Sequence, residues 1–175
     1  LIRNSQINLD GLHIKIGEKT VVRAGMYHND INTRDTLHMQ LNVLESSHSL
    51  VPERYQDFKC LMLGHVMPAI QQKELDQLQE RPKLIVLDTM NFWMDNCLED
   101  LMEALKNGDV ITINDEEARQ LSGEYSLVKA ARKILSFRPQ YLIIKKGEQG
   151  ALLFNNKEVF FAPALPLEEV FDPTG

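Results

Sequence analysis

Cysteine is scarce in this sequence and is poorly placed for a disulfide or a metal site. The 175 residues contain two cysteines, Cys60 and Cys97, far apart and outside any CxxC motif. The five histidines never recur at i, i+3 or i+4, which excludes a zinc-binding helix. We therefore expect two free thiols in a reducing, cytoplasmic setting.

Long apolar runs and an excess of positive charge are also missing. The longest apolar stretches are short, such as Leu84–Leu87, whereas a membrane helix needs about 20 residues. No signal-peptide pattern opens the chain. With 19 basic and 25 acidic residues the net charge is −6, which gives no electrostatic reason to bind nucleic acid. We expect a chain that binds neither membranes nor nucleic acids and that, lacking an initial Met, begins inside a longer protein.

Two nucleotide-binding motifs are absent. There is no GxxxxGK[ST] sequence, so a Walker A loop is excluded. No GxGxxG follows the first predicted α/β strand, which disfavours a dinucleotide-binding domain. Any phosphate site must be built in another way.

What is present falls into two parts. Residues 1–51 alternate polar and apolar side chains, as in Leu12–Ile16 and Thr20–Arg23, and Gly17-Glu18-Lys19 is typical of a hairpin turn. This pattern predicts a small antiparallel sheet with one wet face. Such a sheet is too small to build a core alone and must rest on the remainder of the chain.

Residues 52–175 alternate short apolar strands with amphipathic helices. This alternation predicts an α/β fold whose parallel sheet is covered on both faces. The predicted strands are Cys60–Leu63, Leu84–Leu87, Val110–Ile113 and Tyr141–Ile144, followed by a hairpin of Ala151–Phe154 and Val159–Phe161 around Asn155-Asn156. Four helices are predicted: one from Pro68 to about Glu80 and one from Leu98 to Leu105. A short third helix ends at Ser122-Gly123, and a fourth begins after a cap at Ser126.

Polar residues follow three successive predicted strands. Ligands of open parallel sheets bind beyond the carboxyl ends of the strands. The polar segments are Asp88 to Asn91, Asn114 to Glu117 and Lys145 to Gly150, and the chain closes with Asp172-Pro173-Thr174-Gly175.

Each segment has two interpretations. Asn114 and Glu117 have the spacing of a capping box, or Glu117 lies near a hydrated Mg²⁺ ion while Asn114 binds phosphate oxygens. Lys145 to Gly150 is a glycine turn or a phosphate cradle. The terminal four residues fit a type I turn. Phe92 and Trp93 favour packing over a stacking platform.

Together, in this order, the segments resemble the ribokinase-like (PfkB) carbohydrate kinases. The similarity lies in the NxxE of Asn114 to Glu117, the glycine pair within Lys145 to Gly150, and the terminal Asp-Pro-Thr-Gly, which in the family continues as Ala-Gly-Asp. It covers roughly Leu61 to Gly175. The resemblance implies a three-layer αβα fold with a mostly parallel sheet and a small antiparallel lid, the latter formed by residues 1–51.

The resemblance also implies roles on the nucleotide side. Asn114 and Glu117 would serve the Mg²⁺–phosphate network of ATP. Lys145, Gly147 and Gly150 would flank the nucleotide phosphates, with Lys145 standing where relatives often have Thr.

Further implied roles fall on the chain's last residues and on the acceptor. Asp172 and Thr174 would shape a loop for K⁺, and Gly175 would open the anion hole. Asp88, Asn91, Thr33 and Arg34 are candidates for contact with the acceptor, although Thr33 and Arg34 equally suit a solvated loop. The family's catalytic Asp would follow Gly175, so this chain alone is expected to be inactive.

The resulting hypothesis is an ATP-dependent kinase that phosphorylates a sugar hydroxyl and dimerises through its lid. A nucleoside kinase of the same fold is the near alternative, and the modest aromatic content of 7% weighs towards sugars. A non-catalytic sugar- or nucleotide-binding module is the rival from a different class.

Overall fold

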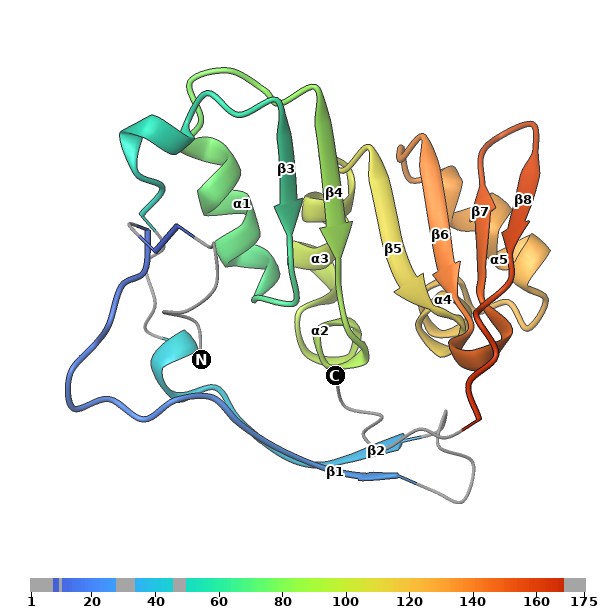
Figure 1. The fold of residues 1–175 in the computed structure, drawn as a ribbon, viewed down its shortest axis with the longest axis horizontal. Helices are drawn as coiled ribbons and strands as arrows, with labels where there is room; N and C mark the ends of the chain where they lie inside the picture. Colours follow the sequence, from blue (N-terminus) through green and yellow to red (C-terminus); the bar gives the residue numbers. More distant parts are fainter. Residues whose placement is uncertain (1–7, 10, 28–33, 46–49, 169–175) are drawn as a thin grey trace.

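The computed structural model describes residues 8–9, 11–27, 34–45 and 50–168. It contains a six-stranded sheet in the order β3-β4-β5-β6-β7-β8 and a separate two-stranded hairpin (Figure 1). The strands of the large sheet are β3 (Cys60–Leu63), β4 (Leu84–Asp88), β5 (Val110–Asn114), β6 (Tyr141–Lys145), β7 (Ala151–Phe154) and β8 (Val159–Ala162). β3 to β6 are parallel, and β7 and β8 are antiparallel additions at one edge.

Five helices connect the parallel strands or follow them. They are α1 (Pro68–Asp76), α2 (Asn91–Asn96), α3 (Leu98–Leu105), α4 (Asp115–Ser122) and α5 (Leu127–Leu135). The predicted positions of α1, α3, α4 and α5 are confirmed, although α1 ends at Asp76 rather than near Glu80. The short helix α2 was not predicted. Ser126 is the N-cap of α5 as predicted, but its side chain makes no capping hydrogen bond.

The helices form a continuous series in which α1 contacts α3, α3 contacts α2, α2 contacts α4, and α4 contacts α5. Parallel strands in monotonic order, joined by right-handed crossovers, place their helices on one face of the sheet. Burial agrees, because alternate strand residues such as Leu87, Ile111, Ile113, Leu142 and Ile144 are fully buried. The described residues cover the opposite face only in part. Within them, the expectation of a sheet covered on both faces is met for one face and not for the other.

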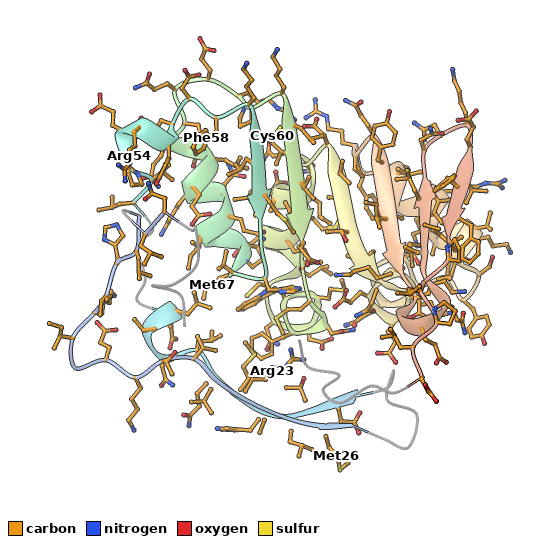
Figure 2. The ribbon with its side chains drawn as sticks, in the orientation of Figure 1. Arg23, Met26, Arg54, Phe58, Cys60 and Met67 are labelled. Carbon is orange, nitrogen blue, oxygen red and sulfur yellow. The ribbon has the colours of Figure 1, made fainter. Side chains whose placement is uncertain are left out.

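The second sheet is a lid hairpin, defined as β1 (Val22–Tyr27) and β2 (Arg34–Gln40). It runs past the ends towards which β3 to β6 point (Figure 1). Figure 2 shows Arg23 on its core-facing side and Met26 on the opposite side. The small antiparallel sheet expected to accompany the α/β part is therefore confirmed.

The position of the predicted hairpin turn at Gly17-Glu18-Lys19 is wrong. Residues 12–21 form no strand, and the paired strands begin only at Val22. Leu12, Ile14 and Ile16 are 55%, 73% and 96% exposed, so their alternation has no apolar surface to face. Alternation predicts a strand only where one side meets a core.

The hairpin of β7 and β8 is confirmed, and its turn has a local cause. The Asn155 side-chain oxygen accepts hydrogen bonds from the backbone N–H groups of Lys157 and Glu158, each at 2.7 Å. This Asx-type turn reverses the chain between the strands. No helix among the described residues has the length and apolar character needed to cross a membrane.

We predict that Gly150→Ala strongly destabilises the fold. Gly150 has φ +98°, and an added Cβ would lie 2.1 Å from the Ala162 carbonyl oxygen. The free energy of unfolding should fall by at least about 2 kcal/mol, as measured by urea denaturation. Gly64→Ala is the matched control, because a Cβ at Gly64 meets nothing within 4 Å. Equal stability of the two variants would contradict the prediction.

Candidate functional site

The junction of β5 and α4 is a complete capping box. The Asn114 side-chain oxygen accepts from the Glu117 N–H at 2.7 Å, and Glu117 Oε2 accepts from the Asn114 N–H at 2.8 Å. The capping interpretation of these two residues is therefore confirmed. It leaves one carboxylate oxygen, Oε1 of Glu117, without a role in the cap.

Glu117 is a buried carboxyl group at this junction. The residue is 2% exposed. Burial raises the pKa of Glu117 above its ordinary value, while the backbone hydrogen bond at Asn114 and the charge of Lys145 oppose that rise. A nearby cation stabilises the ionised form of such a group, so Glu117 suits a site that receives positive charge.

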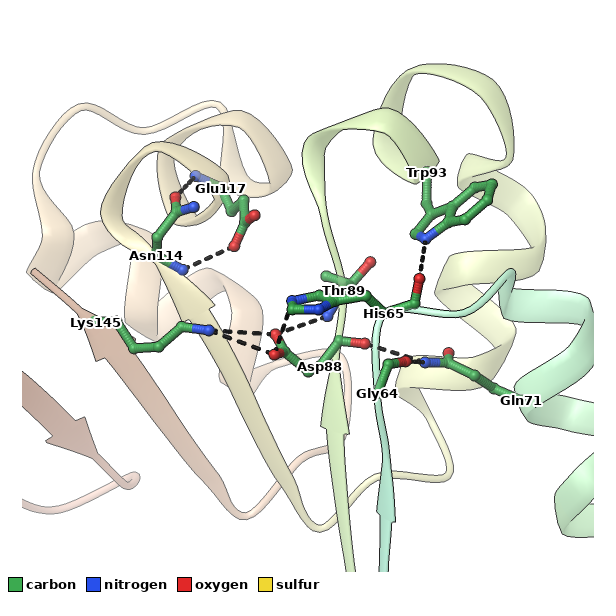
Figure 3. A network of polar contacts seen from close by, with 9 residues as sticks. All are labelled: Gly64, His65, Gln71, Asp88, Thr89, Trp93, Asn114, Glu117 and Lys145. Atoms are coloured by element: carbon green, nitrogen blue, oxygen red, sulfur yellow. Dashed lines mark hydrogen bonds and ion pairs between the residues drawn. The ribbon is translucent and has the colours of Figure 1, made fainter. Parts of the chain in front are cut away.

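A second buried carboxylate, Asp88, stands at the end of β4 and is surrounded by donors. His65 Nε2 lies 3.0 Å from Asp88 Oδ2, and the Thr89 N–H donates to Oδ1 at 2.9 Å. Lys145 Nζ lies 3.4 and 3.5 Å from the two oxygens. Figure 3 shows His65 and Lys145 converging on Asp88 from different strands.

The register of the sheet explains why Lys145 reaches Asp88. Asp88 pairs with Thr112, and Thr112 pairs with Ile143, two residues before Lys145. Asp88 and Lys145 therefore project from the same face of the sheet on either side of β5. Neighbouring strands are about 4.8 Å apart, and the extended lysine side chain crosses the intervening strand.

Asp88 is held in its ionised form. Burial alone raises its pKa, but the His65 hydrogen bond, the charges of Lys145 and His65, and the Thr89 N–H together lower it below the ordinary value. The Asp88 side chain is 8% exposed, whereas that of Lys145 is 45% exposed. The ammonium group of Lys145 thus contacts a buried partner that fixes its position, and it remains open to solvent on its other side.

Sequence reasoning missed the contribution of β3. His65 follows this strand directly, and the nearby Gln71 on α1 donates to the carbonyl oxygens of Gly64 at 2.6 Å and Asp88 at 3.1 Å. Trp93 Nε1 donates to the His65 carbonyl oxygen at 3.2 Å. The rule that polar residues beyond strand ends form the site would have found His65, had it been applied to the first parallel strand.

The segment from Lys146 to Gly150 forms a compact turn. The Gln149 N–H donates to the Lys146 carbonyl at 3.1 Å, and the Gly150 N–H donates to Gly147 at 3.0 Å. The turn interpretation is therefore confirmed for these amides, which are engaged internally. The Lys146 N–H also donates to the Gly150 carbonyl, at 2.8 Å. Gly147 has φ +55° and lies two residues beyond Lys145, so any phosphate cradle would depend on the amides of Gly147 and Glu148.

A cleft of about 500 Å³ separates the lid hairpin from the core, and we call it the lid cleft. Its lining residues are Arg23, Asp35, Thr36, Leu37, His38 and Met39 from the lid hairpin, and Asn91, Phe92, Asp95 and Glu116 from the core. Of the predicted acceptor residues the structure brings Asn91 to this cleft, whereas Asp88 joins Lys145. Trp93 is 1% exposed and packs in the core, as predicted.

The structure says less about the other predicted site residues. Thr33, Asp172, Thr174 and Gly175 lie outside the described residues. Arg34 is the first residue of β2 and pairs with Tyr27. The K⁺ loop and the anion hole consequently stay predictions.

The described residues do not form a complete metal site by themselves. Among them no group of three His, Cys, Asp or Glu side chains could hold a metal. Mg²⁺ is typically held by one or two carboxylates together with water and substrate phosphates. The buried carboxyl of Glu117, with Oε1 outside the capping box, fits that manner of binding.

These features define a class of protein. A parallel α/β sheet carries polar and ionisable groups beyond the carboxyl ends of four neighbouring strands, and a cleft lies between an antiparallel hairpin and the residues that follow two of these strands. The profile of the pfkB family of carbohydrate kinases matches residues 1–175, and the chain belongs to this family.

Individual relatives agree with that membership. A cytidine kinase of Thermococcus kodakarensis is 27% identical over 177 residues, covering 98% of this chain and 62% of that protein. A Burkholderia thailandensis nucleoside kinase in complex with inosine has a TM-score of 0.67 at 20% identity, over 91% of this chain and 52% of that one. A ribokinase II of E. coli in complex with ATP and Mg²⁺ has a TM-score of 0.64 at 18% identity, over 79% and 49%. The chain thus spans about half to three fifths of the length of these relatives, and the ribokinase-like fold expected from the sequence is confirmed.

We predict that Asp88→Asn lowers the free energy of unfolding by about 2 kcal/mol at pH 7, because hydrogen bonds to a charged group are lost. The pKa of Asp88 lies below its ordinary value of 3.8 in the folded chain. Its contribution is therefore present above that value and is lost as the pH falls through the lower folded pKa. Urea denaturation from pH 7 to pH 3 should show the difference shrinking. Asp76→Asn, an exposed carboxylate on α1, is the control, and a pH-independent difference would contradict the prediction.

Proposed function

We propose that this chain provides the nucleotide- and metal-binding part of an ATP-dependent kinase that phosphorylates a hydroxyl group of a sugar. The observation that carries the proposal is the convergence of Lys145, Asp88 and Glu117 beside a lidded cleft. Phosphoryl transfer needs positioning and charge neutralisation more than covalent chemistry. A fixed ammonium group and a carboxyl suited to a cation are the parts required.

In this proposal each residue has a distinct task. Lys145, held by Asp88, neutralises charge on the transferring phosphoryl group. Glu117 would hold the hydrated Mg²⁺ that accompanies ATP, and Asn114 would bind phosphate oxygens; when bound, the ion would neutralise phosphate charge. Support for ATP and Mg²⁺ comes from the E. coli ribokinase II, which is in complex with both. The amides of Gly147 and Glu148 would complete the phosphate contacts, while Gly150 serves the turn.

Other parts of the proposal rest on the resemblance. The catalytic base would follow Gly175, Asp172 and Thr174 would shape a K⁺ loop, and Gly175 would open the anion hole. The lid of residues 1–51 would close over the acceptor and pair with a second copy, in keeping with the exposed Val22 and Met26 on the lid hairpin.

A nucleoside kinase is the second candidate, and two observations favour it. The cytidine kinase and the inosine-bound nucleoside kinase are both relatives of this chain. In addition, Leu37, Met39 and Phe92 give the lid cleft an apolar section that suits the face of a base. Release of ADP by the full-length protein, assayed with sugars and with nucleosides, separates the two candidates. Failure of every acceptor would overturn both.

We predict that Glu117→Gln lowers Mg²⁺-dependent ATP affinity by about tenfold or more. The loss of stability should stay within about 1 kcal/mol, because glutamine also satisfies a capping box. Since burial raises the pKa of Glu117, the wild-type affinity should also rise with pH as the carboxyl ionises, and the variant should lose this rise. Calorimetric titration of Mg²⁺-ATP across pH measures both effects. Glu124→Gln is the control; a purely structural Glu117 would leave affinity and pH profile unchanged.

We predict that Lys145→Met lowers kcat/KM by about 100-fold, as expected for the removal of one charge-stabilising donor. The neighbouring Lys146→Met, which removes the same charge one residue later, should have a much smaller effect. Steady-state ADP release measures both variants. Equal losses would indicate that only the overall charge of the segment matters.

A further inference from the structure

One wall of the lid cleft is a fixed chain of amide and carboxylate groups. The Asn91 Nδ2 donates to Gln120 Oε1 at 2.6 Å, and the Gln120 Nε2 donates to Asp95 Oδ1 at 2.7 Å. A carboxylate only accepts, so the Asp95 end sets the orientation of Gln120, and Gln120 in turn sets that of Asn91. These two hydrogen bonds do not use the Asn91 side-chain oxygen or the second carboxylate oxygen of Asp95, and both of these atoms are acceptors.

The rest of the lining has the same character. Glu116 on α4 adds a second carboxylate to that of Asp95. Arg23 is the one Lys or Arg among the described lining residues, and it donates to Thr36 Oγ1 at 3.0 Å. Asp35 and His38 also border the cleft, but they pair with Met26 and Ala24, on the side of the lid hairpin opposite Arg23.

This arrangement selects by charge and by hydrogen-bond sense. Hydroxyl and amino groups donate to carboxylate and amide oxygens, whereas a phosphate dianion offers only acceptors. The two carboxylates of Asp95 and Glu116 against one guanidinium also repel a dianion, because like charges placed opposite each other cost free energy in specific recognition. The cleft volume of about 500 Å³ lies within the ordinary range of ligand pockets, about 300–1,000 Å³, and accommodates either a sugar or a nucleoside.

We propose that the lid cleft binds an uncharged acceptor rich in hydroxyl or amino donors and rejects phosphorylated sugars, with Asp95 and Asn91 as specificity-determining residues. This inference rests on the proposed function, since it assigns the acceptor of that reaction. It divides the possible acceptors by charge, a division that membership of the family does not make.

The first test compares acceptors on the full-length protein. ADP release and calorimetric binding are measured with D-ribose, cytidine and D-fructose 6-phosphate at the same ionic strength. We expect binding and turnover with ribose or cytidine and at least about 100-fold weaker binding of the phosphosugar. Preference for the phosphosugar would overturn the inference while leaving the kinase proposal intact. Binding of an uncharged acceptor without any ADP release would overturn the kinase proposal and leave the inference intact, and binding of none of the three would overturn the inference.

The second test assigns the specificity to its residues. Asp95→Asn should raise KM for the uncharged acceptor about tenfold with little change in KM for ATP, and should strengthen inhibition by D-fructose 6-phosphate. Glu116→Gln should strengthen the same inhibition and serves as a second variant if Asp95→Asn folds poorly. Glu99→Gln on α3, outside the cleft lining, makes the same charge change and should alter neither constant. Equal behaviour of all three variants would overturn the assignment.

Discussion

The buried negative charge of Asp88 is the constraint on which the site depends. An unpaired carboxylate at this depth would carry a large desolvation cost, and the fold meets it with donors from His65, Thr89 and Lys145. Because these donors stand at the ends of β3, β4 and β6, the single charge fixes the relative positions of three strand ends. Gln71 reinforces the link by bonding both the Gly64 and the Asp88 carbonyls. The ammonium group of Lys145 then faces the solvent from a fixed position. It can therefore bind an anion without the free-energy cost of first ordering a long side chain.

The second junction shows that structural and functional interpretations of one motif can both hold. Asn114 and Glu117 close a complete capping box, which by itself explains the spacing of the two residues. The cap, however, uses only one oxygen of a nearly inaccessible carboxyl group whose pKa is raised by burial. A helix cap alone functions equally well at the surface, so burial of the acid next to Asp88 and Lys145 is a cost that the cap does not explain. A cation at the site would offset that cost, and this is why the two interpretations are compatible.

The fold was predictable where a pattern reflected local packing, and it was not predictable where the outcome depended on a distant surface. The parallel strands and their helices follow from runs such as Val110–Ile113 and from caps such as Asn114, and the structure has them within a few residues. The alternation at Leu12–Ile16 was misleading, because nothing in the sequence reveals that no apolar surface lies opposite. The ion pair of Asp88 with Lys145 depends on strand order and register across β5, which single-sequence patterns do not encode. Asn91 follows a strand end and lies at the lid cleft, but its partner Gln120 lies on α4 and gave no signal.

The site therefore divides into two regions of opposite electrostatic character. On the sheet side Lys145 and His65 offset Asp88, and the segment beyond β6 suits the phosphates of a nucleotide. Along the lid cleft, Asp95 and Glu116 outnumber Arg23, which is the one Lys or Arg among the described lining residues. A kinase must bind a highly charged nucleotide and an acceptor in the same cleft, each in its own position. If either substrate also binds in the other's position, the unproductive complex lowers the rate of phosphoryl transfer. In the proposed kinase, opposed charge in the two regions would supply that discrimination, since a polyphosphate is attracted to the strand ends and repelled by the acidic wall of the lid cleft. Under that proposal the acidic wall would contribute to the orientation of ATP as well as to the choice of acceptor.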